Sequence, residues 1–281
     1  MPQFSVALIQ AELENADNTA LLRREIKSVR ARFPWVDMVV LAELASFGTN
    51  PKTAQTLPGP AENMYADLAR EVELWIIPGS LYELCDGVIY NTAPVINPAG
   101  EVVARARKTY PFAPYEQGVA GGEHFTTFDV PSVGRFGVSI CYDMWFPETT
   151  RSLVHLGAEA IIHPSLTGTI DRDVELAIAR ASAAMNNVYF FDLNAAGQLG
   201  LGKSIVVGPG GEVLHQAGAA REIIPVEIDF DYVRRVREQG WHGLGQPLKS
   251  FRDHSVTFPA YSGEESPTLN ALGPLKKPGA E

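Results

Sequence analysis

Short apolar runs alternate with amphipathic segments along most of this chain, and the alternation limits the folds that are open to it. The runs at residues 4–10, 36–41 and 74–80 have the length of buried strands. The segments 18–33 and 63–72 carry apolar residues at helical spacing. Strands and helices that follow one another in this way fold into layers. We therefore predict an α/β protein.

The rest of the chain repeats this pattern and ends differently. Strands are expected at 88–96, 101–106, 135–140, 160–163, 188–193, 203–207, 212–215 and 223–228, and helices at 148–156, 174–186 and 231–239. Residues 1–240 are therefore predicted to form a single domain. Residues 241–281 contain Gly and Pro with little periodicity. They predict an extended C-terminal arm that packs on another subunit.

Composition excludes several classes of function. The chain has 281 residues, enough for a sizeable core, and its net charge of -10 without a basic cluster argues against nucleic-acid binding. Two cysteines do not suggest a disulfide scaffold. The N-terminal apolar run is short and has no basic region before it, and no run of about 18 apolar residues suggests a membrane span. We expect a cytoplasmic protein with free thiols.

Three side chains that could take part in catalysis each follow an apolar, strand-like run. Glu43 ends the run that begins near residue 36, Lys108 follows residues 101–106, and Cys141 follows residues 135–140. In α/β folds, ligands meet catalytic groups at the carboxyl ends of strands. A thiol there can act as a nucleophile if a base accepts its proton. A desolvated carboxylate suits that task, and a fixed cation suits a developing oxyanion.

Each of these residues alone also fits an ordinary structural role. Glu43 could be a surface acid or a helix cap, and Lys108 a solvated strand end. Glu116, in a loop with Pro111 and Pro114, could be another surface acid. Their common position after strands is the stronger signal, because such strand ends can converge on one rim of a sheet.

Five further residues are candidates to line a substrate pocket. They lie close to the proposed nucleophile or near other predicted strand ends on the same rim: Tyr142, Trp145, Tyr115, Ser165 and Asn194. The six His residues show no metal-ligand spacing, so we expect neither a metal nor a cofactor. His163 is more typical of a structural histidine, and Cys85 of a bystander thiol in a turn.

The segments around these positions resemble the nitrilase superfamily of carbon–nitrogen hydrolases. Its members place a Glu, a Lys and a Cys after strands in this chain order. Here the corresponding segments are LAE ending at Glu43, RKTYP around Lys108 and ICYDMWFPE around Cys141, and a second acid of the family matches Glu116. The resemblance extends over nearly the whole chain. It implies a four-layer αββα sandwich, with two mixed sheets and helices outside, and usually homodimers or larger homo-oligomers.

The resemblance also implies a chemistry. Cys141 attacks a carbonyl carbon, Glu43 is the general base, and the Lys108 ammonium and the Tyr142 backbone N–H hold the oxyanion. Glu116 orients Lys108 or the substrate. Tyr142-Asp143 after the nucleophile is similar to amidase-like members, whereas nitrile-cleaving members typically have Trp-Glu. This favours a small linear amide as substrate, cleaved to acid and ammonia through a thioester.

Other functions stay open at the level of sequence. An N-carbamoyl-amide hydrolase would need a cation for a substrate carboxylate, and Arg172 could serve, although a surface ion pair explains Arg172 equally well. A nitrilase is a further alternative. A protein of another class, a non-catalytic interaction protein with the same fold, is disfavoured because the Glu–Lys–Glu–Cys set is intact.

Overall fold

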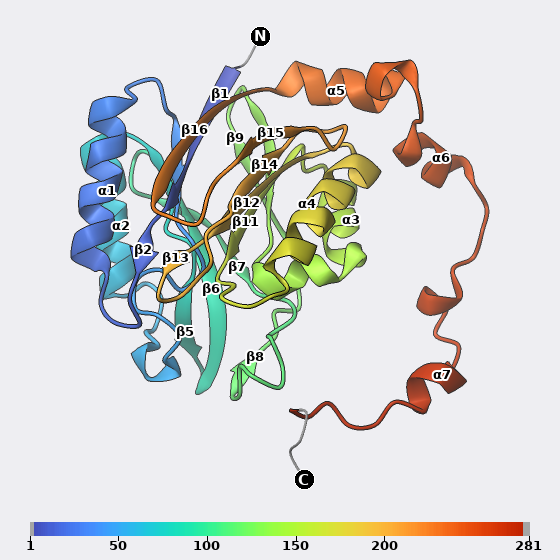
Figure 1. Cartoon of the computed structure of the whole chain (residues 1–281), viewed down its shortest axis with the longest axis horizontal. Coiled ribbons are helices and arrows are strands. Elements are labelled where there is room, and N and C mark those ends of the chain that lie inside the picture. The colour runs from blue at the N-terminus through green and yellow to red at the C-terminus, as the bar shows by residue number, and fades with distance from the viewer. Residues whose placement is uncertain (1–2, 278–281) are drawn as a thin grey trace.

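The computed structural model describes residues 3–277, and it contains two sheets that pack face to face with helices on their outer sides (Figure 1). The first sheet consists of β1 (Gln3–Gln10), β3 (Met38–Val40), β4 (Trp75–Ile77), β5 (Leu81–Cys85), β6 (Val88–Ile96), β7 (Val102–Arg107), β8 (Val119–Ala120) and β16 (Glu222–Asp229). Its order is β16-β1-β3-β4-β6-β5, and β7 and β8 also pair with β6.

The second sheet is smaller and also mixed. It has the order β15-β14-β12-β11-β10-β9 and consists of β9 (Thr126–Val130), β10 (Gly134–Val138), β11 (Ala160–Ser165), β12 (Tyr189–Asn194), β14 (Ile205–Val207) and β15 (Val213–Gln216). The central pairs β10–β11 and β11–β12 are parallel, and the outer pairs are antiparallel. A separate small pair joins β2 (Glu12–Leu13) to β13 (Ala196–Gly197).

Helices cover both outer faces. α1 (Thr19–Arg32) and α2 (Pro60–Val72) pack on the first sheet, whereas α3 (Pro147–His155) and α4 (Arg172–Asn186) pack on the second. Short 3-10 helices lie at Pro51–Thr53, Cys141–Trp145, Trp241–Gly243 and Pro259–Tyr261. The predicted αββα sandwich with helices outside is thus confirmed (Figure 1).

Alternating side chains of the second sheet build two cores at once. On β11, Ile162 faces the core between the sheets, and Ile161 faces the core beneath α3 and α4. Phe191 and Phe190 on β12 divide in the same way. Full burial of such a side chain contributes about 1.5–3 kcal/mol. The first halves of these strands, residues 160–162 and 189–191, are accordingly apolar, and buried polar residues occur only toward the strand ends.

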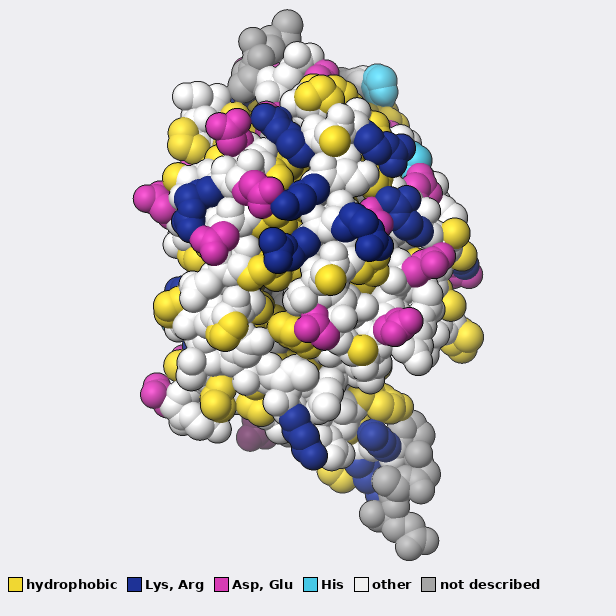
Figure 2. All heavy atoms as spheres, turned by 90° about the vertical axis from the view of Figure 1, so that its left-hand side faces the viewer, with side chains coloured by type: hydrophobic (Ala, Val, Ile, Leu, Met, Phe, Trp, Pro, Cys, Tyr) yellow, Lys and Arg dark blue, Asp and Glu magenta, His cyan; other side chains and the backbone are white. Residues whose placement is uncertain are grey.

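The helices α1 and α2 expose their outer surface, away from the first sheet, to solvent. Figure 2 shows this side of the molecule, where basic and acidic side chains are interspersed. Ion pairs such as Lys27–Glu71 join α1 to α2 across it. Such exposed pairs add little stability. Within residues 3–277, no helix is both long enough and apolar enough for a membrane span.

The sequence-based element boundaries need some correction. β3 is shorter than the apolar run at 36–41, and β5 and β9 were not anticipated. Both lie at the ends of their sheets and carry partly exposed, polar residues, which weakens their strand pattern. Cys85 ends β5 instead of lying in a turn.

The chain leaves the sandwich after α5 (Phe230–Gln239). Residues 241–277 form an arm with α6 (Pro247–Asp253) and α7 (Pro267–Asn270), and Figure 1 shows this arm bending away from the body of the molecule. Neither α6 nor α7 has a buried residue. We refer to residues 241–277 as the C-terminal arm.

Candidate active site

Glu43 lies in the turn that follows β3, and its side chain is almost fully buried. Its backbone N–H donates to the Ser165 carbonyl at 3.2 Å, so the ends of β3 and β11, one from each sheet, meet here. The chain at Gly79 passes close to this turn. Gly79 has a φ of +70°, and a Cβ there would lie 1.7 Å from the Ala42 carbonyl oxygen. Only glycine permits this approach, which holds the turn beneath Glu43.

Lys108 follows β7 and is buried between two acids. Its Nζ lies 2.9 Å from Glu43 Oε1 and 2.8 Å from Glu116 Oε2. The Asn91 side chain, from β6, donates to the same two acids at 2.8 and 3.4 Å. The Phe112 backbone N–H also donates to Glu116. Lys108 is therefore held with its ammonium in one place.

Cys141 is the first residue of the 3-10 helix Cys141–Trp145, which follows shortly after β10 of the second sheet. Its φ of 49° is in the left-handed region, which is costly for a side chain that is not glycine. The sulfur hydrogen-bonds Glu43 and accepts from the Leu166 backbone N–H. The thiol, the carboxylate and the ammonium thus form one connected cluster.

Burial and charge set the resting protonation of this cluster. Loss of hydration raises the pKa of Cys141 well above its ordinary value, and the Glu43 charge adds to this while Lys108 opposes it. Burial also raises the pKa of Glu43, again opposed by Lys108. Burial would lower the pKa of Lys108, but the surrounding negative charges raise it well above its usual value. Cys141 therefore rests as a thiol that requires a base, and Glu43 is hydrogen-bonded to it.

Two buried polar residues near the cluster were missed by sequence reasoning. Asn91 bonds both acids, and its signal is a polar residue inside the otherwise apolar end of β6. Asp143 accepts hydrogen bonds from the backbone N–H groups of Ile140 (2.9 Å) and Tyr110 (2.8 Å). It ties the Cys141 turn to the loop after Lys108, and burial raises the pKa of Asp143 to about 7.

Three of the predicted pocket residues lie in an aromatic cluster beside Cys141. The Tyr142 ring contacts Phe112 at a centroid distance of 5.0 Å and Trp145 at 6.4 Å, and Phe112 stacks on Tyr115 at 4.9 Å. Tyr115 is 52% exposed and Trp145 36% exposed. The structure brings these three residues together, and Phe112, which joins them, was not predicted.

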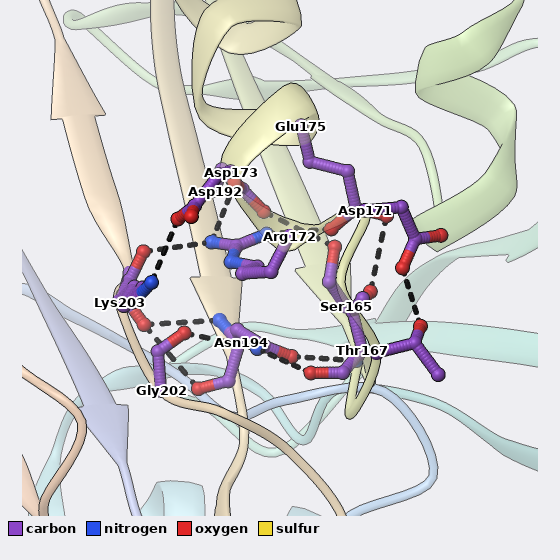
Figure 3. A network of polar contacts seen from close by, with 12 residues as sticks. Ser165, Thr167, Asp171, Arg172, Asp173, Glu175, Asp192, Asn194, Gly202 and Lys203 are labelled. Carbon is purple, nitrogen blue, oxygen red and sulfur yellow. Dashed lines mark hydrogen bonds and ion pairs between the residues drawn. The ribbon is translucent and has the colours of Figure 1, made fainter.

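The other two predicted pocket residues lie in a buried polar network, shown in Figure 3. Asn194 donates to the carbonyls of Thr167 and Gly202 and accepts from the Thr167 backbone N–H, and Ser165 donates to Asp192. These side chains are fully buried and bonded to protein groups, and they are not part of the aromatic cluster.

Arg172 needs a correction. A surface ion pair was one explanation for it, but the side chain is fully buried and pairs with Glu175 at 3.0 Å and Asp192 at 2.7 Å. A guanidinium engaged in this way does not meet the requirement for a free cation that would hold a substrate carboxylate.

His163 is also buried and lies outside the cluster. Its Nδ1 lies 2.7 Å from Ser139 Oγ, and burial lowers the pKa of His163 to about 4, so the ring is neutral. This agrees with a structural histidine. Among residues 3–277, no group of three or more His, Cys, Asp or Glu side chains is placed to hold a metal ion.

Comparison with known proteins agrees with this arrangement. The model of the carbon-nitrogen hydrolase family matches residues 5–238. The omega-amidase NIT2-B of Xenopus laevis is 29% identical over 266 residues, which cover 85% of this chain and 93% of that protein. A formamidase of Bacillus thuringiensis (strain Al Hakam) is 29% identical over 206 residues, 71% of this chain and 62% of that protein.

Solved structures extend the similarity to three dimensions. Saccharomyces cerevisiae Nit3, described as a member of branch 10 of the nitrilase superfamily, superimposes with a TM-score of 0.77 at 29% identity and covers 84% of this chain and 93% of Nit3. The amidase from Nesterenkonia sp. AN1, at 22% identity, has a TM-score of 0.73 over 84% of this chain and 97% of that chain, and shares the fold. The family match, the fold and the Glu–Lys–Cys cluster together show that this chain belongs to the carbon-nitrogen hydrolase family, as an amidase-like enzyme of the nitrilase superfamily.

Proposed function

We propose that this enzyme hydrolyses the carbon–nitrogen bond of a small linear amide to a carboxylic acid and ammonia, through a thioester on Cys141. The observation that carries the proposal is the connected cluster in which Glu43 bonds the Cys141 thiol and also the Lys108 ammonium. Nucleophile, base and cation are the three parts that acyl transfer needs.

The first half of the reaction forms the thioester. Cys141 Sγ attacks the carbonyl carbon as its proton passes to Glu43. The negative charge that develops on the carbonyl oxygen is stabilised by the Lys108 ammonium and the Tyr142 backbone N–H. The C–N bond then breaks, and Glu43 gives the proton to the leaving nitrogen, which departs as ammonia.

The second half releases the acid. Glu43 accepts a proton from a water molecule, and the resulting hydroxide attacks the thioester carbon. The C–S bond breaks, and the proton on Glu43 returns to the Cys141 sulfur, which restores the resting thiol. Glu116 holds Lys108 in place throughout, and Asn91 holds Glu43, because each pair is hydrogen-bonded.

The relatives support an amide as substrate. Omega-amidases, a formamidase and an amidase share the family or the fold, and Tyr142-Asp143 is the amidase-like pair. An N-carbamoyl-amide hydrolase is less well supported, since Arg172, the cation suggested for it, is paired with two buried acids. The Tyr142-Asp143 pair likewise gives no support to a nitrilase.

Ammonia release from a panel of substrates tests the proposal. The panel contains short aliphatic amides, ω-amides, carbamoyl amino acids and nitriles. We expect turnover with at least one linear amide, while turnover restricted to nitriles or carbamoyl compounds would contradict the assigned substrate class.

A non-catalytic protein of the same fold would fail a different test. In a catalytic protein, iodoacetamide should modify Cys141 faster than Cys85, and Glu43→Gln should remove the difference. Equal, slow labelling of both thiols would favour the non-catalytic alternative.

We also infer that the C-terminal arm packs on a second subunit of the same chain. The arm carries apolar side chains that the body leaves exposed: Leu244, Phe251, Val256, Phe258, Tyr261, Leu269, Leu272 and Leu275. A cavity of about 1100 Å³ lies between the arm and helices α3 and α4. Exposed apolar surface of this extent is typical of a site that another protein surface covers.

A further inference from the structure

Residues 165–167 lie against two groups of the catalytic centre. The Ser165 carbonyl accepts from the Glu43 backbone N–H at 3.2 Å, and the Leu166 backbone N–H donates to the Cys141 sulfur. A shift of this short segment would therefore move the Ser165 carbonyl, which bonds Glu43, and the Leu166 N–H, which bonds Cys141, at the same time.

The opposite side of the segment is held by buried side chains (Figure 3). Ser165 Oγ donates to Asp192 Oδ1 at 3.1 Å, and Thr167 Oγ1 donates to Glu175 Oε1 at 3.1 Å. Asn194 bonds both the N–H and the carbonyl of Thr167. Two acids, from α4 and β12, thus help to hold the segment, together with Asn194 and the backbone pairing of β11 with β12.

One cation joins these two acids. Arg172 Nη1 donates to Glu175 Oε2 at 3.0 Å, and Nη2 lies 2.7 Å from Asp192 Oδ2 and donates to the Lys203 carbonyl at 2.9 Å. The three charged side chains are between 0% and 3% exposed. Without the cation, two like charges would face each other in a buried site, and one acid would protonate or move.

Stability alone does not explain such a cluster. Removing ions from water costs several kcal/mol per ion, and well-packed apolar residues can replace a buried ion cluster without loss of stability. A buried network of hydrogen bonds and ion pairs, in contrast, favours one arrangement of its parts. In this chain the parts include the segment that contacts Glu43 and Cys141.

We propose that Arg172 is a positioning residue of the catalytic centre: it holds Glu175 and Asp192, and through them it fixes residues 165–167 against Glu43 and Cys141. The proposal rests on the proposed function only in taking Cys141 as the nucleophile. Arg172 touches no reacting atom. Its effect should appear in the reactivity of the Cys141 thiol.

The test measures alkylation of Cys141 by iodoacetamide as a function of pH, in a Cys85→Ser background, together with kcat and KM. The variants are Arg172→Met, which removes the cation, and Thr167→Val, which removes one hydrogen bond and changes no charge. The matched control is Arg221→Met, because Arg221 pairs with the buried Glu25 of α1, on the helical layer of the other sheet.

We expect Arg172→Met and Thr167→Val each to lower the alkylation rate and kcat by about tenfold or more, as sub-ångström misplacement of reacting groups does. KM should change little. Arg172→Lys should restore part of the rate, and the control should match the parent.

Wild-type alkylation rates in folded Arg172→Met or in Thr167→Val would overturn the proposal. Should Arg172→Met not fold, Thr167→Val decides by itself. Alkylation requires no substrate, so its outcome is separate from the amide assignment. Slow alkylation in these variants supports the positioning role even if no amide in the panel is hydrolysed.

Discussion

The ammonium of Lys108 lies 2.9 Å from a carboxylate oxygen of Glu43, and the two side chains are 1% and 3% exposed. This buried contact places a cation beside the proposed base, which neighbours the proposed nucleophile. Lys108→Ala should therefore lower kcat by about a hundredfold or more, since one oxyanion donor contributes about 3 kcal/mol to the transition state. Steady-state ammonia release measures the loss. Lys27→Ala, which breaks a surface pair, is the control, and an equal effect of both changes would contradict the role of Lys108.

Glu116→Gln should change the pH dependence of catalysis. The charge of Glu116 contributes to raising the pKa of Glu43, so its removal lowers the pKa of that base. Because Glu43 must be ionised to act, the acidic limb of the kcat/KM profile should move to lower pH. The value of kcat should fall about tenfold as Lys108 loses a charged partner. An unshifted acidic limb would show that Glu43 does not titrate there.

Asp143→Asn should alter how stability depends on pH. Burial raises the pKa of Asp143 to about 7, so the folded protein holds a proton that the unfolded chain releases near pH 4. The contribution of Asp143 to the free energy of unfolding therefore falls by about 1.4 kcal/mol per pH unit between about pH 4 and 7. Denaturant titrations should show that the free energy of unfolding of the variant rises by this amount, relative to that of the wild type, as pH increases. His163 has the opposite dependence below pH 6.5, and it cancels in the comparison because both proteins retain it.

Parallel pH curves for the two proteins would contradict this assignment. Such curves would mean that Asp143 does not remain protonated in the folded state up to about pH 7, and the source of its raised pKa, burial beside the Cys141 turn, would be wrong.

Truncation after Gly240 tests the inference about the C-terminal arm. If the arm packs on a second subunit, the full chain should sediment as a dimer or larger, and the truncated chain should shift toward the monomer. Phe251→Ser with Phe258→Ser should have the same direction of effect, because both rings line the cavity between the arm and the body. A full chain that sediments as a monomer at all concentrations would contradict the inference.

The sequence predicted the layers, and it predicted that the proposed catalytic residues lie close together, for a physical reason. Apolar runs such as residues 160–162, at the start of β11, identify buried strands, and polar residues directly after such runs lie near strand ends. Glu43, Lys108 and Cys141 could be found in this way, and the family resemblance added Glu116. The structure brings all four together.

The residues that escaped prediction depend on side-chain direction and on pairing between distant segments. Asn91 lies within a strand, and only the register of β6 decides that it faces the two acids. The buried ion pairs join Arg172 and Glu175, at the start of a helix, to Asp192 on a strand. No local sequence pattern predicts that these residues meet. Ser165 and Asn194 were placed on the right rim, but their side chains point into that network.

The central claim is that Cys141 carries the reaction, and Cys141→Ala tests it most directly. Ammonia release should be measured with the amide that the wild-type enzyme hydrolyses fastest, on a variant shown by circular dichroism to be folded. We predict a rate no higher than the uncatalysed background, because without the sulfur no thioester can form. A Cys141→Ala enzyme with wild-type ammonia release would contradict the account.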